Sequence, residues 1–280
     1  MLYETIPYDP DRHQIFSLHI RKTGGTSLYL ALLPAFRLPE GTRVKGLRNT
    51  TIWTDESGLL GLHGRLRRAV MRAGKALVDA AQAALGRRLI PETELPVSGG
   101  HVTFDTIPRG RRELLLVTIV RDPLARFLSD YRFMRAKRDR SRADCLEAGL
   151  YDLPLPEFAA RILADPALFR WNTQCMQLAG RPEFEPARRV LDEAFWLAGT
   201  TERLQELLDL IGHATGRDIG RIPHFRNTGA GKAARLPDDL ALGLCEKLAE
   251  DAKLHAWVGA EFARIHGAAL GPQAGSAITS

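Results

Sequence analysis

The segment His19–Leu28 (HIRKTGGTSL) sets a lysine, two glycines and three hydroxyl side chains between a β-rich run and a leucine-rich run. A glycine turn between a strand and a helix lets backbone N–H groups approach a phosphate, and the helix N-terminus adds a favourable field. We therefore predict an anion-binding turn formed by Arg21, Lys22, Thr23, Gly24, Gly25, Thr26 and Ser27. The alternative is a purely structural tight turn. Because Lys22 precedes both glycines, the segment is not a Walker A loop, in which the lysine follows them.

A second group of polar residues follows the most apolar run of the chain, Glu113–Val120 (ELLLVTIV). Arg121 stands at the carboxyl end of this predicted strand, where open α/β sheets bind ligands. Ser129 lies two helical turns further along, so the arginine and the hydroxyl can hold one phosphate from two sides. The alternative is structural, with Asp122 capping the helix and Arg126 forming a surface ion pair.

The elements that must position these residues follow from the hydrophobic pattern. Gln14–Ile20 (QIFSLHI) is a predicted strand, and a helix begins at Thr26-Ser27 because hydroxyl residues are good N-caps. Strand, glycine turn and helix make the first half of a βαβ unit. The near-continuous apolar run 113–120 fits a central parallel strand covered on both faces, and Pro123 fits the first turn of the next helix.

The remaining segments predict a mostly helical chain with two more short strands, at Leu95–Ser98 and Phe195–Gly199. The pattern predicts helices over Pro123 to about Arg138, Leu204–Leu210 and Asp238 to about His266, a broken helical region over 140–179, and a basic amphipathic helix or helix pair over Leu62–Leu89. We expect one α/β domain over 1–270, a three-layer P-loop-like fold with a central parallel sheet. Helical insertions are expected at about 41–95 and 140–180, and a flexible tail at 271–280.

Composition limits the class of protein more than it identifies a function. The chain has 280 residues, 45% of them hydrophobic, with a formal net charge of +6, which fits a globular protein with an anionic ligand, nucleic acid or membrane surface as partner. Three scattered cysteines without CxxC spacing indicate a reducing compartment and no zinc cluster. The polar, acid-containing start is unlike a signal peptide, and no apolar stretch is long enough to span a bilayer. We therefore expect a cytoplasmic protein.

Taken together, the two polar groups resemble the phosphosulfate loop and the 3′-phosphate site of sulfotransferases that use 3′-phosphoadenosine 5′-phosphosulfate (PAPS). The resemblance is closest to the branch that includes the heparan sulfate 2-O- and 6-O-sulfotransferases, with motifs similar to H-I-[PR]-K-T-G-G-T-S and R-D-P-x-x-R-x-x-S-x-Y. Both motifs are present, with Arg21 where proline is commoner. Further similar segments, in the same order, are GGHVTF at 99–104, NTQCMQLAG at 172–180, TTERL at 200–204 and HFRNTG at 224–229.

This resemblance implies a role for His101, since the family carries its general base in a G-H-x-x-F segment. Imidazole titrates near neutral pH and can accept the proton of an acceptor hydroxyl. Some relatives have a second histidine two residues earlier, where Gly99 stands here. On composition alone, a lone histidine is more often a structural or surface residue than a base.

The resemblance also implies the remaining ligand contacts and the reaction partners. Lys22 stabilises the departing phosphate, and Thr201 reaches the adenine, although Thr-Thr-Glu is also a plain helix N-cap. A late loop covers the nucleotide with Arg226, Asn227, Gly229 and Lys232. PAPS is the co-substrate, 3′-phosphoadenosine 5′-phosphate is the product, and no metal is expected. The implied acceptor is a carbohydrate, such as a capsular or lipid-linked glycan, with no nucleic acid and no membrane span.

Two other classes of function remain compatible with the residues. A P-loop-like kinase or other phosphotransferase would share the general architecture, but it normally needs a lysine after the glycines and an acid that organises Mg²⁺. A non-catalytic nucleotide or polyanion binder would use the basic helices as its working surface.

Overall fold

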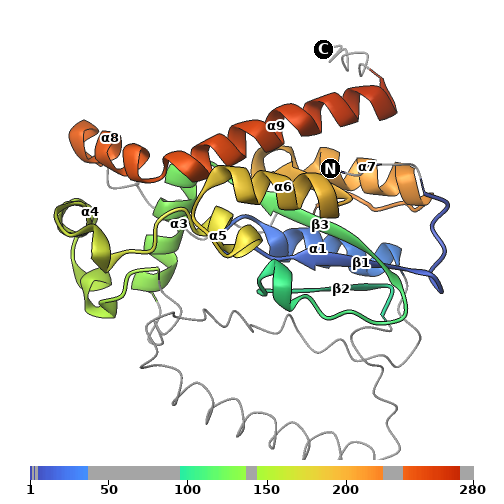
Figure 1. The fold of residues 1–280 in the computed structure, drawn as a ribbon, viewed down its shortest axis with the longest axis horizontal. Coiled ribbons are helices and arrows are strands. Elements are labelled where there is room, and N and C mark those ends of the chain that lie inside the picture. The colour runs from blue at the N-terminus through green and yellow to red at the C-terminus, as the bar shows by residue number, and fades with distance from the viewer. Residues whose placement is uncertain (2, 4–5, 37–94, 137–143, 223–235, 272–280) are drawn as a thin grey trace, which may run out of the picture.

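The computed structural model describes residues 1, 3, 6–36, 95–136, 144–222 and 236–271 of the chain. Its centre is a sheet of four parallel strands in the order β2-β1-β3-β4 (Figure 1), formed by β1 His13–Leu18, β2 Val97–Gly100, β3 Glu113–Val120 and β4 Leu197–Thr200. The predicted α/β fold with a central parallel sheet is therefore confirmed. All four strands run in one direction, so their carboxyl ends lie along one edge.

Helices cover both faces of this sheet, as the alternation of side chains along the strands requires. Ile15, Leu115 and Val117 face a core shared with α1 Gly25–Ala35 and α7 Leu204–Thr215. Phe16, Leu18 and Leu116 face the opposite core, shared with α5 Thr173–Ala179 and α6 Phe184–Ala194. The long helix α9 Ala249–Leu270 lies across the molecule beside α6 and α7 and contributes to both cores (Figure 1). The result is three layers.

A third apolar cluster lies beyond the sheet, among α3 Pro123–Arg135, α4 Leu155–Ala164 and α8 Asp238–Lys247 (Figure 1). Its centre is a set of aromatic rings in which neighbouring centroids lie 4.9–6.4 Å apart, namely Phe127, Tyr131, Tyr151, Phe158 and Phe169. Short 3₁₀ segments connect the main elements, at Phe104–Thr106, Ala148–Asp152, Pro166–Leu168 and Thr201–Arg203. This cluster holds α3 in place against the end of β3.

The predicted element bounds agree with the structure at β3 and shift elsewhere. The first strand ends at Leu18 because the chain turns there, and β2 and β4 each lie one or two residues later than predicted. Gly99 belongs inside β2: a Cβ there would stand 2.6 Å from the Ser17 carbonyl oxygen of β1. Helix α6 was not predicted. The predicted insertion at 41–95 and basic helix at 62–89 lie almost entirely outside the described residues.

The predicted single helix from Asp238 to about His266 is wrong, because the structure has two helices that meet at Leu248. Asn172 occupies this break. Its side-chain amide nitrogen donates to the Lys247 carbonyl at 3.1 Å, and its oxygen accepts from the Asp251 backbone N–H at 3.1 Å. In return the Asp251 carboxylate accepts from the first amides of α5, so the two helix starts cap one another.

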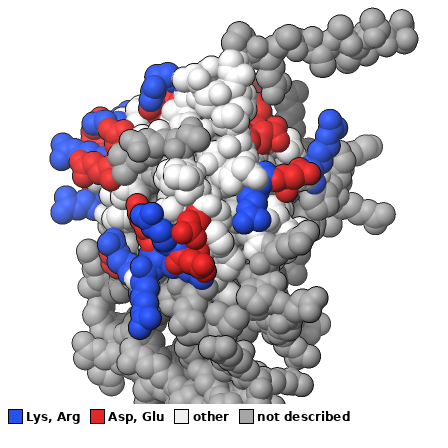
Figure 2. All heavy atoms as spheres, turned by 90° about the vertical axis from the view of Figure 1, so that its right-hand side faces the viewer, with Lys and Arg blue, Asp and Glu red and all other residues white. Residues whose placement is uncertain are grey.

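Basic and acidic side chains are interspersed on the described part of the face shown in Figure 2. No helix in the described ranges is long and apolar enough to cross a membrane.

Candidate functional site

The predicted anion-binding turn connects the end of β1 to the start of α1. Two of its residues have left-handed backbone, Lys22 with φ 64° and Gly24 with φ 91°. Gly24 caps α1, and its carbonyl accepts the amides of Ser27 and Leu28. The earlier amides, those of Gly25 and Thr26, have no helical carbonyl before them and point out of the helix end. This arrangement directs partial positive charge toward the space above the turn.

Side chains bond the carbonyl groups of this turn. The Thr23 hydroxyl donates to the Ile20 carbonyl at 2.9 Å, and the Thr201 hydroxyl donates to the Thr23 carbonyl at 2.7 Å. The Arg121 guanidinium donates through Nη1 to the Lys22 carbonyl at 3.1 Å. The carbonyls of Ile20, Lys22 and Thr23 are therefore occupied, while the N–H donors of the turn face the helix end. Two residues predicted to bind ligand, Arg121 and Thr201, also hold the turn in shape.

Lys22 is half-buried at the edge of the turn, and its ammonium lies over the ring of Phe133, with Nζ 4.1 Å from the ring centroid. A cation over an aromatic face is stabilised by roughly 0.5–2 kcal/mol. Phe133 belongs to α3 and is 40% exposed, so the contact lies at the surface. Because Lys22 belongs to the turn, its ammonium remains within one side-chain length of the turn backbone.

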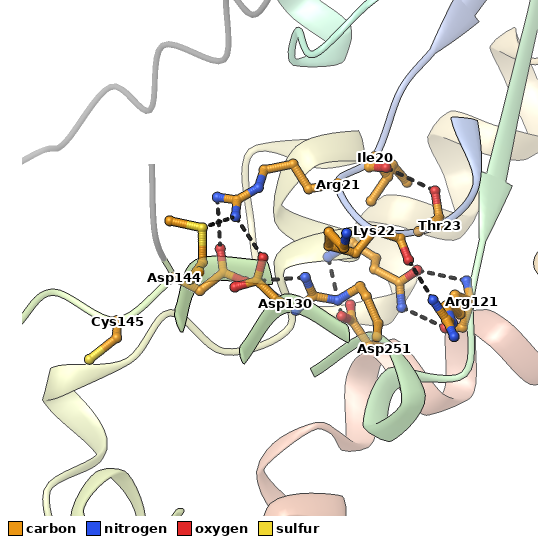
Figure 3. A network of polar contacts seen from close by, with 12 residues as sticks. Ile20, Arg21, Lys22, Thr23, Arg121, Asp130, Asp144, Cys145 and Asp251 are labelled. Carbon is orange, nitrogen blue, oxygen red and sulfur yellow. Dashed lines mark hydrogen bonds and ion pairs between the residues drawn. The ribbon is translucent and has the colours of Figure 1, made fainter. Parts of the chain in front are cut away.

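Arg21 was predicted to bind the anion, but its guanidinium is engaged elsewhere (Figure 3). It donates through Nη2 to Asp130 at 2.6 Å, and Nη1 lies 3.8 Å from Asp144. Both carboxylates are buried, and the arginine side chain is 10% exposed. In Figure 3 this side chain extends away from Thr23 and Arg121. Arg21 therefore tethers the turn to α3 and to the segment at Asp144.

The tether is part of a larger buried charge cluster. Arg126, the residue proposed as a surface ion-pair partner, is fully buried and donates to Asp144 at 3.1 Å. Its Nε and Nη2 atoms have no hydrogen-bond partner among the described residues. Burial, together with the charge of Asp144, raises the pKa of Asp130 to about 6, although Arg21, Arg126 and Lys22 oppose the rise. Burial also raises the pKa of Asp251.

Arg121 and Ser129 lie on β3–α3 as predicted. The Arg121 peptide is clamped by the side chain of Gln174, which accepts from its N–H and donates to its C=O, both at 2.9 Å. Burial lowers the pKa of the Arg121 guanidinium, and the negative charges of Glu202 and Asp122 oppose this lowering. Asp122 caps α3 by accepting from the Ala125 amide at 2.7 Å, as the structural interpretation predicted. Ser129 is half-buried on α3, beside Asp130.

His101 lies just past β2 and contacts the end of β1. Its Nδ1 is 2.8 Å from the His19 carbonyl oxygen, and the His19 and His101 rings stack with centroids 3.9 Å apart. A carbonyl only accepts hydrogen bonds, so Nδ1 must carry the hydrogen, and in neutral His101 the Nε2 atom keeps its lone pair. An imidazole in this tautomer can act as a base through Nε2.

His19 belongs to the site, although no role was predicted for it from the sequence. Burial, the charge of His101 and the charge of Lys22 lower its pKa to about 3, so it is uncharged at neutral pH. Its Nδ1 is buried and has no hydrogen-bond partner in the part of the chain that the structure describes. The ring packs against Gly25, where a Cβ would lie 2.1 Å from the His19 Cδ2 atom. The signal available in the sequence was that His19 stands near the end of the predicted strand, shortly before the glycine turn that contains Gly25.

The remaining predicted residues divide between the helix start and the part of the chain that is not described. Thr26 is exposed and Ser27 half-buried in the first turn of α1. Arg226, Asn227, Gly229 and Lys232 lie outside the described residues. Within the described ranges, no group of three or more His, Cys, Asp or Glu side chains could hold a metal ion.

No family model matches this chain, and no curated protein matches it.

Gly25→Ala should destabilise the protein by about 1–3 kcal/mol, the usual cost of overpacking. The new methyl group would clash with the His19 ring, which cannot withdraw because His101 stacks on it. Urea unfolding measures the change. Gly259→Ala in α9 is the matched control, because its nearest neighbour would be 3.8 Å away and alanine favours a helix by about 1 kcal/mol. Equal unfolding midpoints for Gly25→Ala and the unaltered protein would contradict the packing described.

Asp130→Asn should change how stability depends on pH. Because the pKa of Asp130 is raised in the folded protein, its proton stabilises the fold at low pH and that contribution is lost as pH rises through about 6. As pH rises from 4 to 6, the free energy of unfolding of the unaltered protein, measured relative to that of Asp130→Asn, should fall by up to about 1.4 kcal/mol per pH unit. Unfolding titrations measure the slope.

Glu206→Gln is the control for this titration, because a hydrogen bond from Arg203 lowers the pKa of Glu206. Its contribution should run the opposite way and be lost as pH falls. A difference between Asp130→Asn and the unaltered protein that stays constant from pH 4 to 7 would contradict the assignment.

Proposed function

We propose that this chain is a sulfotransferase that moves the sulfuryl group of PAPS to a hydroxyl of a carbohydrate acceptor. One observation carries the proposal: at the ends of β1, β2 and β3, Arg121 contacts the glycine turn and His101 contacts the residue at the end of β1 that leads into this turn. His101 meets the His19 carbonyl, and Arg121 meets the Lys22 carbonyl. An anion site, a second cationic group and an oriented base thus lie along one edge of the sheet, where α/β folds bind ligands.

The turn suits the 5′-phosphosulfate end of PAPS. The amides at the start of α1, the hydroxyls of Thr26 and Ser27 and the Lys22 ammonium are donors for the phosphosulfate. The 3′-phosphate is assigned to Arg121 and Ser129. Arg121 uses one of its five N–H donors on the Lys22 carbonyl, which leaves the others for a phosphate.

The reaction assigned to the site is an in-line displacement at sulfur. His101 Nε2 takes the proton of the acceptor hydroxyl while the acceptor oxygen forms its bond to sulfur. The bond from sulfur to the bridging phosphate oxygen breaks, and its electron pair stays on that oxygen. Lys22 and the amides of the turn stabilise the charge that develops there. General-base assistance of this kind contributes about 10²–10⁴-fold to the rate.

Two further parts of the proposal, the carbohydrate acceptor and a cytoplasmic location of the protein, come from the sequence. The motif resemblance is to glycan-modifying enzymes, and the three cysteines are all free thiols, Cys145 and Cys175 buried and Cys245 exposed. Free thiols are typical of reducing compartments.

His101→Ala should abolish transfer of sulfate from ³⁵S-labelled PAPS to unsulfated oligosaccharides, with a loss of about 10²–10⁴-fold. It should leave thermal stabilisation by 3′-phosphoadenosine 5′-phosphate unchanged, because His101 contacts no phosphate in this scheme. Lys22→Ala is the contrasting variant and should weaken both transfer and stabilisation. Unchanged transfer in His101→Ala would remove it as the base. Transfer of phosphate from ATP, with no transfer from PAPS, would overturn the proposed function.

A further inference from the structure

Helix α5 buries two glutamines, Gln174 and Gln177, on the side that faces the carboxyl ends of the strands. Gln177 is 1% exposed, and its side-chain nitrogen donates to the His19 carbonyl and to the Val102 carbonyl, each at 2.9 Å. Both partners are acceptors, so the amide can only be oriented with its nitrogen toward them. One side chain thus joins the ends of β1 and β2.

These two carbonyls lie on either side of His101. The His19 carbonyl is the group that accepts from His101 Nδ1, and Val102 is the residue that follows His101. A carbonyl oxygen has two lone pairs. On His19, one accepts from Gln177 and the other from His101. Gln177 therefore fixes both the acceptor against which the imidazole is oriented and the backbone that carries it.

We infer that Gln177 is a positioning residue for His101, holding its imidazole with the hydrogen on Nδ1 and the lone pair on Nε2. The catalytic consequence rests on the proposed function, in which Nε2 takes the acceptor proton. The tautomer itself does not depend on that function.

Gln174 supplies a matched comparison within the same helix. It lies one turn earlier on α5, is fully buried, and also makes two side-chain hydrogen bonds at a strand end: it accepts from the Arg121 N–H and donates to the Arg121 carbonyl. It makes no contact with the His19 or Val102 carbonyls. Loss of either amide removes two hydrogen bonds at a strand end, but only loss of Gln177 acts on His101.

Gln177→Met keeps the length of the side chain and removes both donors. We expect ¹H–¹⁵N spectra of labelled histidine to show the Nδ1–H tautomer of His101 in the unaltered protein and a shift toward Nε2–H in Gln177→Met. Turnover of PAPS should fall on the order of 10²-fold, the usual consequence of a misplaced catalytic group. Affinity for 3′-phosphoadenosine 5′-phosphate should not change. Gln174→Met should leave the tautomer unchanged and weaken nucleotide affinity through Arg121.

Gln177→Leu is the second variant if the methionine variant does not fold, because its apolar side chain cannot donate either. The inference is overturned if a folded variant keeps the Nδ1–H tautomer, or if the unaltered protein lacks it. A tautomer shift in a protein that transfers no sulfate would support the positioning role while the proposed function fails. The two outcomes are therefore distinguishable.

Discussion

The carboxyl ends of neighbouring parallel strands leave backbone carbonyls that no strand can pair, and the candidate site is built from the side chains that bond them. A buried carbonyl without a partner costs about 1–3 kcal/mol, so each must find a donor. Gln177 bonds two of them, Gln174 bonds a third, and the Thr201 hydroxyl bonds a fourth, the Val120 carbonyl at the end of β3. Because the same peptides carry or orient His101 and Arg121, satisfying the strand ends also sets the direction of these side chains.

The glycine turn adds a second constraint, since its donors must stay exposed while its carbonyls are bonded. The left-handed backbone at Lys22 is unfavourable by roughly 1–2 kcal/mol for an L-residue, and it persists because neighbouring groups hold the turn. One of these groups is Arg21, whose guanidinium forms ion pairs with the buried carboxylates of Asp130 and Asp144. Removing one member of such a cluster leaves an uncompensated charge, so the turn and α3 are strongly coupled.

Local patterns predicted the parts of the fold that depend on local sequence. Strand β3 agrees at both ends because its apolar run is uninterrupted. Helix α1 begins at Gly25, before the predicted start at Thr26-Ser27, because Gly24 and not a hydroxyl residue is its N-cap. The break at Leu248 was missed because Asn172, a distant residue in the chain, creates it. The Arg21 pairing was missed because Asp130 lies 109 residues away. Gln177 lies in the segment 172–180 that carries the resemblance, but its role was missed because a single polar residue in a short helix does not reveal what it bonds.

The account's central claim is that the glycine turn and the end of β3 together hold a nucleotide phosphorylated at both its 5′ and 3′ positions. Isothermal titration calorimetry with 3′-phosphoadenosine 5′-phosphate and with adenosine 5′-phosphate tests this directly. Hydrogen bonds to a charged group contribute about 1.5–3 kcal/mol, so the bisphosphate should bind roughly 10- to 100-fold more tightly. Equal affinities, or no binding of either nucleotide, would contradict the claim.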